Sequence, residues 1–229
     1  MQISITKNID GARNAEGIVV IIDVFRAFST AYYLLANNAK QVMPVNGDDA
    51  AFAMKESYPD SILIGETRGK KVEGFDYGNS PLEIKDLAFY DKTLILKSTR
   101  GTTGLGNVDS EKADEVLVGA FLGIEAIANY IKHRNPEKVT LVCMGNSGDE
   151  DALEDNLFAE SLQDLLQGKS INYQTTYDKI RSDRTAERFF DPTLTHSPQE
   201  DFNLCLEFNK FDFVMKYNLK TGVLEKAQY

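Results

Sequence analysis

The sequence predicts an α/β protein, a three-layer α/β/α sandwich around a mostly parallel β-sheet that is also mixed. Three observations support this fold class. Short apolar runs rich in β-branched residues recur along the chain, segments with helical periodicity separate them, and a hairpin pattern follows. Strands that alternate with helices form βαβ units, which build parallel sheets with helices on both faces. We expect residues 1–229 to form a single domain, because no linker, repeat or low-complexity segment divides them.

The first strong strand is expected at 17–23, where nearly every residue is apolar. A strand that is buried on both faces has this composition. Similar runs follow at 41–45, 61–65, 93–97, 115–119 and 138–143, and helical patterns lie between them at 26–38, 48–58, 121–134 and 152–166. Residues 211–217 then alternate between apolar and polar, and a turn leads into Val223. This last pattern predicts a terminal antiparallel hairpin.

Two segments have the same helix-start pattern, Ser-Pro-x-Glu, at 80–83 and 197–200. Serine at the N-cap, proline at the first helical position and glutamate at the third form a capping box. We therefore expect a helix to begin after Ser80 and another after Ser197. The highly charged stretch 176–197 has weak periodicity and is expected to cover a sheet edge or the active site.

Composition excludes several classes of protein. Hydrophobic residues make up 42% of the chain, which is too many for a disordered protein. The net charge of −10 repels phosphate backbones, so we expect no nucleic-acid partner. Cys143 and Cys205 lie in apolar runs and are expected to be reduced thiols. No apolar run approaches the roughly 18 residues of a membrane span, and no signal-peptide pattern is present, so we expect no membrane partner and a cytoplasmic location.

Polar and charged residues follow several of the predicted strands. Asp23 ends the first strong strand and Arg26 comes soon after it, while Glu66 and Arg68 follow the strand at 61–65. The segment 98–104 reads Ser-Thr-Arg-Gly-Thr-Thr-Gly after the strand at 93–97. Ligands of open α/β sheets bind beyond the carboxyl ends of the strands. We therefore expect these side chains to gather at one edge of the sheet.

This mixture of residues suits a small anionic substrate. Arginines bind phosphate, carboxylate or sulfonate oxygens, and glycine and hydroxyl residues before a helix donate to anions. Carboxylates such as Asp23, Glu66, Glu154 and Asp155 can hold Mg²⁺. Each feature also has a structural interpretation: Asp23 as a helix cap, Glu66 with Arg68 as a surface ion pair, 98–104 as a plain turn, and the acidic residues near 150 as a solvated helix start.

Spacing excludes several familiar chemistries. A cysteine-based phosphatase needs arginine six positions after the cysteine, but Asp149 stands six after Cys143. A haloacid-dehalogenase-type phosphatase needs a second aspartate two positions after the first, where Phe25 stands. The glycines at 101, 104 and 106 match neither phosphate-loop motif. Neither of the two histidines, His133 and His196, lies in a metal-type cluster of the sequence.

Four segments resemble one known family. Residues 23–30 (Asp-Val-Phe-Arg-Ala-Phe-Ser-Thr) are similar to its D-V-x-R-A-x-S-T motif, and residues 74–81 (Gly-Phe-Asp-Tyr-Gly-Asn-Ser-Pro) to its G-F-D-x-G-N-S-P motif. Residues 98–102 are similar to its T-T-N-G-T turn, with Arg100 at the position of asparagine, and Leu153-Glu154-Asp155 to its later E-D block. The family is the 2-phosphosulfolactate phosphatase (ComB-like) family.

The resemblance implies a Mg²⁺-dependent phosphatase with an α/β/α sandwich fold. Its substrate would be 2-phospho-3-sulfolactate, or a similar small phosphorylated acid, and its products 3-sulfolactate and phosphate, as in coenzyme M biosynthesis. For this reaction we expect the metal ligands to be Asp23, Glu66, Glu154 and Asp155, and the catalytic residues to be Asp23 and Asp76, the latter as general base. We expect the substrate-binding residues to be Arg26, Arg68, Asn79, Thr99, Arg100, Gly101 and Thr102.

Several alternatives remain open at this point. Asp76 and Asn79 could instead brace the helix that begins after Ser80. The protein could be a non-catalytic relative that binds a small anion, or a Mg²⁺-dependent enzyme such as a transferase that acts on another phosphorylated acid. The sequence also does not separate direct attack by water from a phospho-aspartyl intermediate at Asp23. A homo-oligomer is compatible with the chain.

Overall fold

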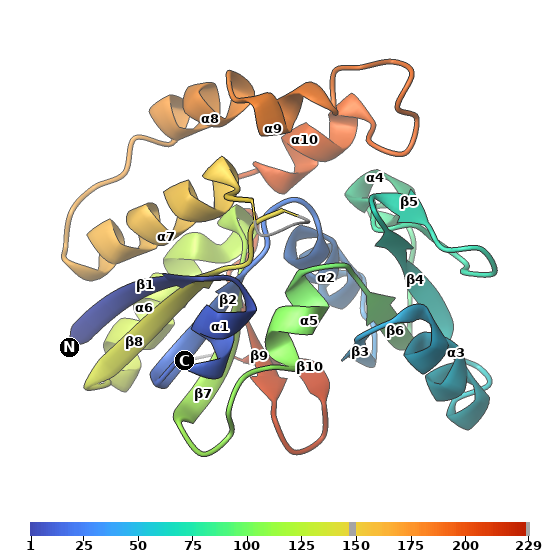
Figure 1. Ribbon diagram of the computed structural model, residues 1–229, viewed down its shortest axis with the longest axis horizontal. Coiled ribbons are helices and arrows are strands. Elements are labelled where there is room, and N and C mark those ends of the chain that lie inside the picture. Colours follow the sequence, from blue (N-terminus) through green and yellow to red (C-terminus); the bar gives the residue numbers. More distant parts are fainter. Residues whose placement is uncertain (147–149, 228–229) are drawn as a thin grey trace.

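The computed structural model describes residues 1–146 and 150–227, and its strands form one ten-stranded sheet (Figure 1). One half is a parallel group of four strands, in the order β1 (Gln2–Lys7), β8 (Lys138–Cys143), β2 (Gly17–Ile22) and β7 (Ala113–Gly119). The other half is a parallel group of three, in the order β3 (Gln41–Val45), β6 (Thr93–Lys97) and β4 (Ile62–Thr67). The short β5 (Lys70–Lys71) pairs antiparallel with β4.

An antiparallel hairpin joins the two parallel groups. It consists of β9 (Val214–Asn218), which pairs with β7, and β10 (Val223–Ala227), which pairs with β3. The junction between β10 and β3 is narrow, with the single registered pair Leu224 and Val42. The mixed sheet and the hairpin are confirmed. The sequence pattern did not predict that the hairpin lies inside the sheet.

Helices cover both faces of the sheet, which confirms the three-layer architecture. Residues of β2 alternate between two cores: Val19 and Ile21 pack in the core that contains α1 (Asn8–Arg13), α2 (Ala27–Ala36) and α5 (Gly101–Leu105). Val20 and Ile22 pack in the opposite core with α6 (Ile124–Arg134), which follows the 3-10 turn Phe121–Gly123, and with α7 (Leu153–Leu166). A third cluster packs α3 (Asp48–Ser57) on β3, β4 and β6. No helix among the described residues is long and apolar enough to cross a membrane.

The segment after α7 forms a cover of short helices, seen at the top of Figure 1: α8 (Tyr173–Arg181), α9 (Arg184–Glu187) and α10 (Gln199–Cys205). Helix α4 (Pro81–Ile84) packs against α10. The expectation that 176–197 covers a sheet edge or the active site is confirmed, because Arg184, Thr185 and Arg188 line the cavity described below.

The two predicted capping boxes are wrong. Helix α4 does begin at Pro81 with Ser80 as N-cap, but the Ser80 hydroxyl donates to Asp201 Oδ1 (2.9 Å) instead of capping its own helix. The same oxygen accepts the Leu82 N–H (2.9 Å). Helix α10 begins one residue later than expected, with Pro198 as its N-cap. A buried carboxylate from α10 thus caps α4, because an ionised acceptor forms a stronger bond than a hydroxyl.

Candidate active site

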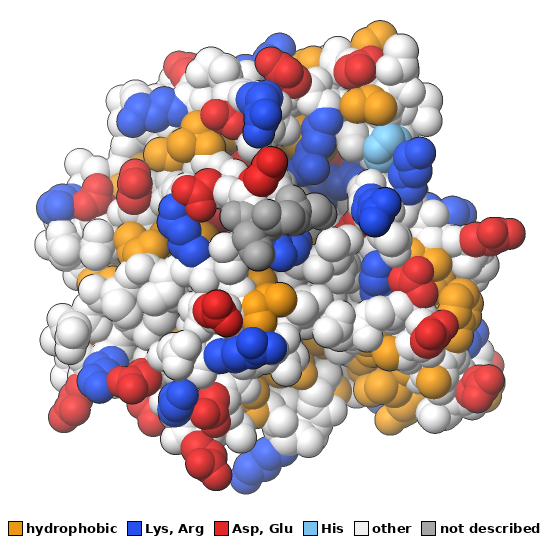
Figure 2. Space-filling model, in the orientation of Figure 1, with side chains coloured by type: hydrophobic (Ala, Val, Ile, Leu, Met, Phe, Trp, Pro, Cys, Tyr) orange, Lys and Arg blue, Asp and Glu red, His pale blue; other side chains and the backbone are white. Residues whose placement is uncertain are grey.

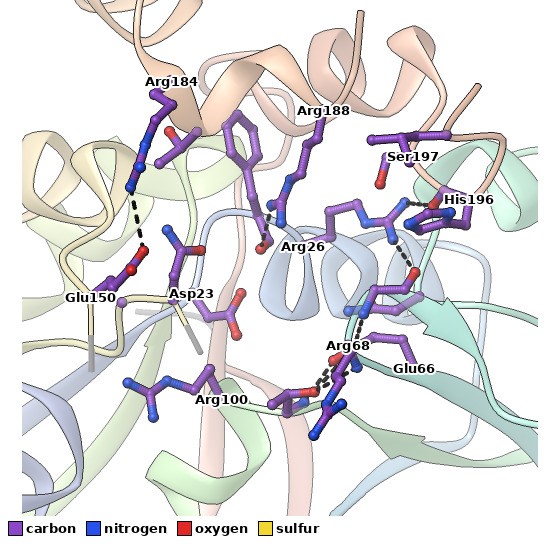
Figure 3. Close-up of a pocket in the computed structure, with 18 residues that line it drawn as sticks. Asp23, Arg26, Glu66, Arg68, Arg100, Glu150, Arg184, Arg188, His196 and Ser197 are labelled. Atoms are coloured by element: carbon purple, nitrogen blue, oxygen red, sulfur yellow. Dashed lines mark hydrogen bonds and ion pairs between the residues drawn. The ribbon is translucent and has the colours of Figure 1, made fainter. Parts of the chain in front are cut away.

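A cavity of about 540 Å³ lies at the carboxyl ends of strands from both parallel groups (Figure 3). Asp23 enters it directly after β2, Glu66 comes from the end of β4, and Thr99 and Arg100 follow β6. The cover segment closes the cavity from the opposite side. The two groups of parallel strands, which lie on either side of the hairpin, therefore contribute to one site.

Asp23 is a buried carboxylate held by two backbone N–H groups. Its Oδ1 accepts from Ala27 (3.1 Å) and its Oδ2 from Gly101 (2.8 Å), which are the first residues of α2 and α5. Burial raises the pKa of Asp23 to about 6, with a further rise from Glu66, although the two N–H bonds oppose this shift. Asp23 is therefore both a helix cap and a cavity carboxylate, so the structural interpretation and the functional one describe the same residue.

Glu66 is likewise buried and hydrogen-bonded at the cavity wall. One oxygen accepts the Thr99 N–H (2.7 Å), and the other accepts the Gly69 N–H (2.5 Å) and the Thr99 hydroxyl (3.2 Å). The alternative of a surface ion pair between Glu66 and Arg68 is wrong, because Glu66 is 7% exposed and no ion pair joins these two residues. Glu66 instead ties the end of β4 to the turn after β6.

Arg26 crosses the far side of the cavity and is fixed at three points. Its Nη1 donates to the His196 carbonyl (2.9 Å) and to Asp201 Oδ2 (2.5 Å), and its Nη2 donates to the Gly69 carbonyl (3.1 Å). Asp201 is fully buried in α10. The guanidinium is thus held in one orientation by the segment before α10, by α10 itself and by the β4–β5 turn.

The cavity is cationic although the chain is acidic. Among the described residues, five arginines and three carboxylates line it; the arginines are Arg26, Arg68, Arg100, Arg184 and Arg188. Figure 2 shows Lys and Arg side chains gathered around a hollow on this face. Such a local field attracts anions despite the net charge of −10.

A family model described as 2-phosphosulpholactate phosphatase matches residues 3–220. The chain belongs to the 2-phosphosulfolactate phosphatase family. A relative from Bacillus subtilis, a probable 2-phosphosulfolactate phosphatase, is 34% identical over 87% of this chain and 86% of its own length. A relative with the same name from Caldanaerobacter subterraneus is also 34% identical, over 92% of this chain and 90% of its own. A third, from Clostridium acetobutylicum, is 40% identical over 57% of this chain and 54% of its own.

This member of the 2-phosphosulfolactate phosphatase family brings together most of the side chains that the sequence singled out. Those that line the cavity are Asp23, Arg26, Glu66, Arg68, Asn79, Thr99 and Arg100. Asn79 is buried and its Oδ1 accepts no hydrogen bond from the part of the chain that the structure describes. An unsatisfied buried oxygen in a cavity wall suits a ligand that donates a hydrogen bond.

Five predicted site residues do not line the cavity: Asp76, Gly101, Thr102, Glu154 and Asp155. Asp76 is exposed, and its Oδ2 accepts the N–H of Leu63 (2.8 Å) near the start of β4. This contact is structural, but it is made with β4 and not with the helix after Ser80, which the alternative expected Asp76 to brace. Gly101 contributes its N–H to Asp23, and Thr102 bonds to Ser98 at the base of α5 (2.9 Å from its hydroxyl to the carbonyl). Gly101 thus orients Asp23, and Thr102 fixes the start of α5, but neither residue lines the cavity.

Glu154 and Asp155 lie behind the cavity wall. Both are almost fully buried at the start of α7. Asp155 accepts the N–H groups of Val24 (2.9 Å) and Gly145 (3.0 Å), and Glu154 accepts the Thr185 hydroxyl (3.1 Å). Burial raises the pKa of both, and the Glu154 and Asp23 charges raise the pKa of Asp155 well above its usual range. Within residues 1–146 and 150–227, no group of three or more His, Cys, Asp or Glu could hold a metal.

Sequence reasoning missed several residues of this site that come from the cover. Arg188 and His196 line the cavity from the cover, and Asp201 holds Arg26 from α10. Burial lowers the pKa of His196, as do the charges of Lys70, Arg26 and Arg188. The sequence feature that pointed to this region was the many charged residues of 176–197. It does not predict which of these side chains point into the cavity.

Proposed function

We propose that the protein is a phosphatase that hydrolyses 2-phospho-3-sulfolactate, or a similar small phosphorylated acid, with Mg²⁺ as cofactor. The observation that carries the proposal is one cavity lined by the buried carboxylates Asp23 and Glu66 and by five arginines, among them Arg26 and Arg100. Membership of the family, whose members are named for this substrate, supports the same reaction. The substrate combines phosphate, carboxylate and sulfonate groups, which suits a cationic cavity in an acidic protein.

The donor set fits Mg²⁺ in a particular way. This ion is usually bound through one or two carboxylates, together with waters and substrate phosphate oxygens. Asp23 and Glu66 are the two buried carboxylates that line the cavity, and the Glu66 charge raises the pKa of Asp23. Asp23 and Glu66 would therefore hold the ion, rather than the full set with Glu154 and Asp155 that we expected from the sequence. When bound, Mg²⁺ would polarise a phosphoryl oxygen and offset the charge that develops on it.

The chain's own residues would orient the substrate. Arg26 is fixed at three points, so it can receive an anionic group without a large loss of side-chain entropy. Arg100 stands before α5 and lines the other side of the cavity, where Thr99 holds Glu66 through its N–H and its hydroxyl. Water then attacks phosphorus, the P–O ester bond breaks, and the substrate leaves as an alcohol with a proton from the water.

Phosphate release from racemic 2-phospho-3-sulfolactate tests the proposal, with Mg²⁺ and with EDTA. Phosphoglycolate and phospholactate serve as substrate controls. We expect turnover that needs Mg²⁺, is fastest on the sulfonated substrate and is abolished by Asp23→Asn. Asp91→Asn is a matched control, because Asp91 is exposed outside the cavity and its left-handed backbone (φ 58°) suits asparagine. Saturable anion binding without phosphate release from any ester would instead identify a non-catalytic binding protein.

A further inference from the structure

Arg188 extends from the end of α9 into the cavity, above Asp23 (Figure 3). Its Nε is buried and has no hydrogen-bond partner among the described residues. The one hydrogen bond that Arg188 donates within the described part of the chain is long, 3.4 Å from Nη2 to the Phe25 carbonyl. Burial lowers the pKa of Arg188, which reflects the cost of holding this cation away from water.

The other cavity arginines are better satisfied. Arg26 and Arg184 form ion pairs with carboxylates, at 2.5 Å and 3.4 Å. Arg100 donates to a backbone carbonyl and to an asparagine oxygen, each at 3.2 Å. Arg68 is exposed, so water solvates its charge. Arg188 stands apart because its buried Nε has no hydrogen-bond partner, and its guanidinium no ion pair, among the described residues.

The groups around Arg188 do not compensate its charge. Glu154 and Asp23 attract it at longer range, whereas Arg26 repels it. Its guanidinium carbon lies 4.9 Å from the centre of the Phe189 ring, a contact that contributes modestly. A buried guanidinium with unused donors is costly unless an anion binds it.

We propose that Arg188 binds an oxyanion of the substrate, the phosphate or the sulfonate group. The bound ligand would supply the negative charge that no neighbouring side chain among the described residues provides at ion-pair distance. The proposal rests on the proposed phosphatase function and adds a substrate-binding residue to it. Because Arg188 belongs to the cover, the same contact would hold the cover against the bound substrate.

Thermal unfolding with simple anions tests this inference without turnover. Inorganic phosphate and methanesulfonate serve as separate probes, in a buffer free of other oxyanions. For the wild-type protein we expect at least one probe to raise Tm by about 5–10 °C when it is present at about 100 times its Kd. Arg188→Met should lose most of this shift. Which of the two probes loses its effect identifies the group that Arg188 binds.

The stability of the variant without anions separates binding from a structural role. An arginine that mainly supports the fold would lower Tm when removed. An uncompensated cation should leave Tm unchanged or higher, so we expect Arg188→Met to be at least as stable as the wild type in anion-free buffer. Arg181→Met is the matched control: Arg181 also stacks on a phenylalanine of the cover, 3.3 Å above the Phe190 ring, but lies outside the cavity. It should keep the full anion shift.

Kinetics complete the test. Arg188→Met should lower kcat/KM by about 10- to 100-fold, and Arg188→Lys, which keeps the charge but not the planar donors, should recover part of the loss. An unchanged anion shift in a folded Arg188→Met protein would overturn the inference while leaving the phosphatase proposal intact. Loss of the shift in a protein whose wild type releases no phosphate would support the inference and overturn the phosphatase proposal.

Discussion

Arg26 and Asp201 lie 175 residues apart in the chain and form a buried ion pair, with 2.5 Å between Nη1 and Oδ2. Arg26 precedes α2, and Asp201 lies in α10. The same carboxylate accepts bonds from Ser80 and Leu82 at the start of α4. One buried charge therefore connects a substrate-facing arginine to two helices that are distant in sequence.

Replacing Asp201 with leucine should destabilise the protein by about 3–5 kcal/mol, because Arg26 would remain buried without its partner. Urea unfolding measures this change. The double variant Arg26→Met/Asp201→Leu should recover a large part of the loss, since it removes the unpaired charge. If the double variant were as unstable as the sum of the two single variants, the ion pair would not be the source of the effect.

Gly101→Ala should lower kcat/KM by about 100-fold while changing stability little. A Cβ at Gly101 would lie 2.7 Å from Asp23 Oδ2, so the carboxylate must shift, and displacements of about 1 Å at a reacting group have costs of this size. Gly106→Ala is the matched control at the other end of α5, because its Cβ would meet nothing closer than 3.7 Å. Steady-state kinetics of both variants should differ sharply; equal activities would mean that Asp23 need not keep its position.

Asn79→Ala should raise KM with a stability loss below about 1 kcal/mol. The Asn79 side-chain oxygen is buried at the cavity without a hydrogen-bond partner among the described residues, so its removal breaks little in the free protein. Asn37→Ala is the comparison, because Asn37 Nδ2 donates to the Ile84 carbonyl (2.7 Å) and should cost about 1–2 kcal/mol. A large loss of stability with normal KM would assign Asn79 to the scaffold.

Glu115 on β7 joins three charged or polar partners at the seam between β7 and β9. Lys216 Nζ lies 2.8 Å away, the Tyr130 hydroxyl donates at 2.5 Å, and Arg134 forms a further ion pair. Burial alone would raise the pKa of Glu115, but these partners lower it below the usual value. A lowered pKa in the folded state stabilises the protein above the unfolded-state pKa of about 4.3, and this stabilisation is lost as pH falls.

Glu115→Gln should therefore destabilise the protein by about 2–4 kcal/mol at pH 7, and the difference from the wild type should shrink below about pH 4. Unfolding in urea across this pH range checks both statements. Glu16→Gln is the control, since Glu16 pairs with Lys138 on the surface and should change stability by less than about 0.5 kcal/mol. A pH-independent difference for Glu115→Gln would show that packing, and not charge, is responsible.

Much of the fold could be predicted because its strands are short and apolar. The runs at 41–45, 93–97 and 138–143 coincide with β3, β6 and β8, and the main helices begin at most three residues from their expected starts. Strand β1 was missed: it lies at the sheet edge, so few of its residues are buried and its apolar signal is weak. Helices α1, α5 and α9 were also missed, since each has six residues or fewer and gives no periodicity.

The sequence predicted those site residues that directly follow a predicted strand. Asp23, Glu66 and Arg100 stand at strand ends, and topology brings strand ends together. Arg188 and Asp201 come from the cover, where tertiary packing alone decides which charges point inward. The burial of both Asp155 oxygens against backbone N–H groups was equally invisible, because those donors belong to residues 24 and 145.

The hairpin between the two parallel groups also determines the order in which the molecule can assemble. Strands β9 and β10 follow every other strand in the chain, yet they fill the gap between β7 and β3. While the ribosome is still making residues 214–227, β7 and β3 expose unpaired edges, which are sites of aggregation. The two strands synthesised last among these ten therefore close the sheet. A nascent chain that stops before residue 214 would carry every described residue that lines the cavity and still lack the strands that join the two halves of the cavity.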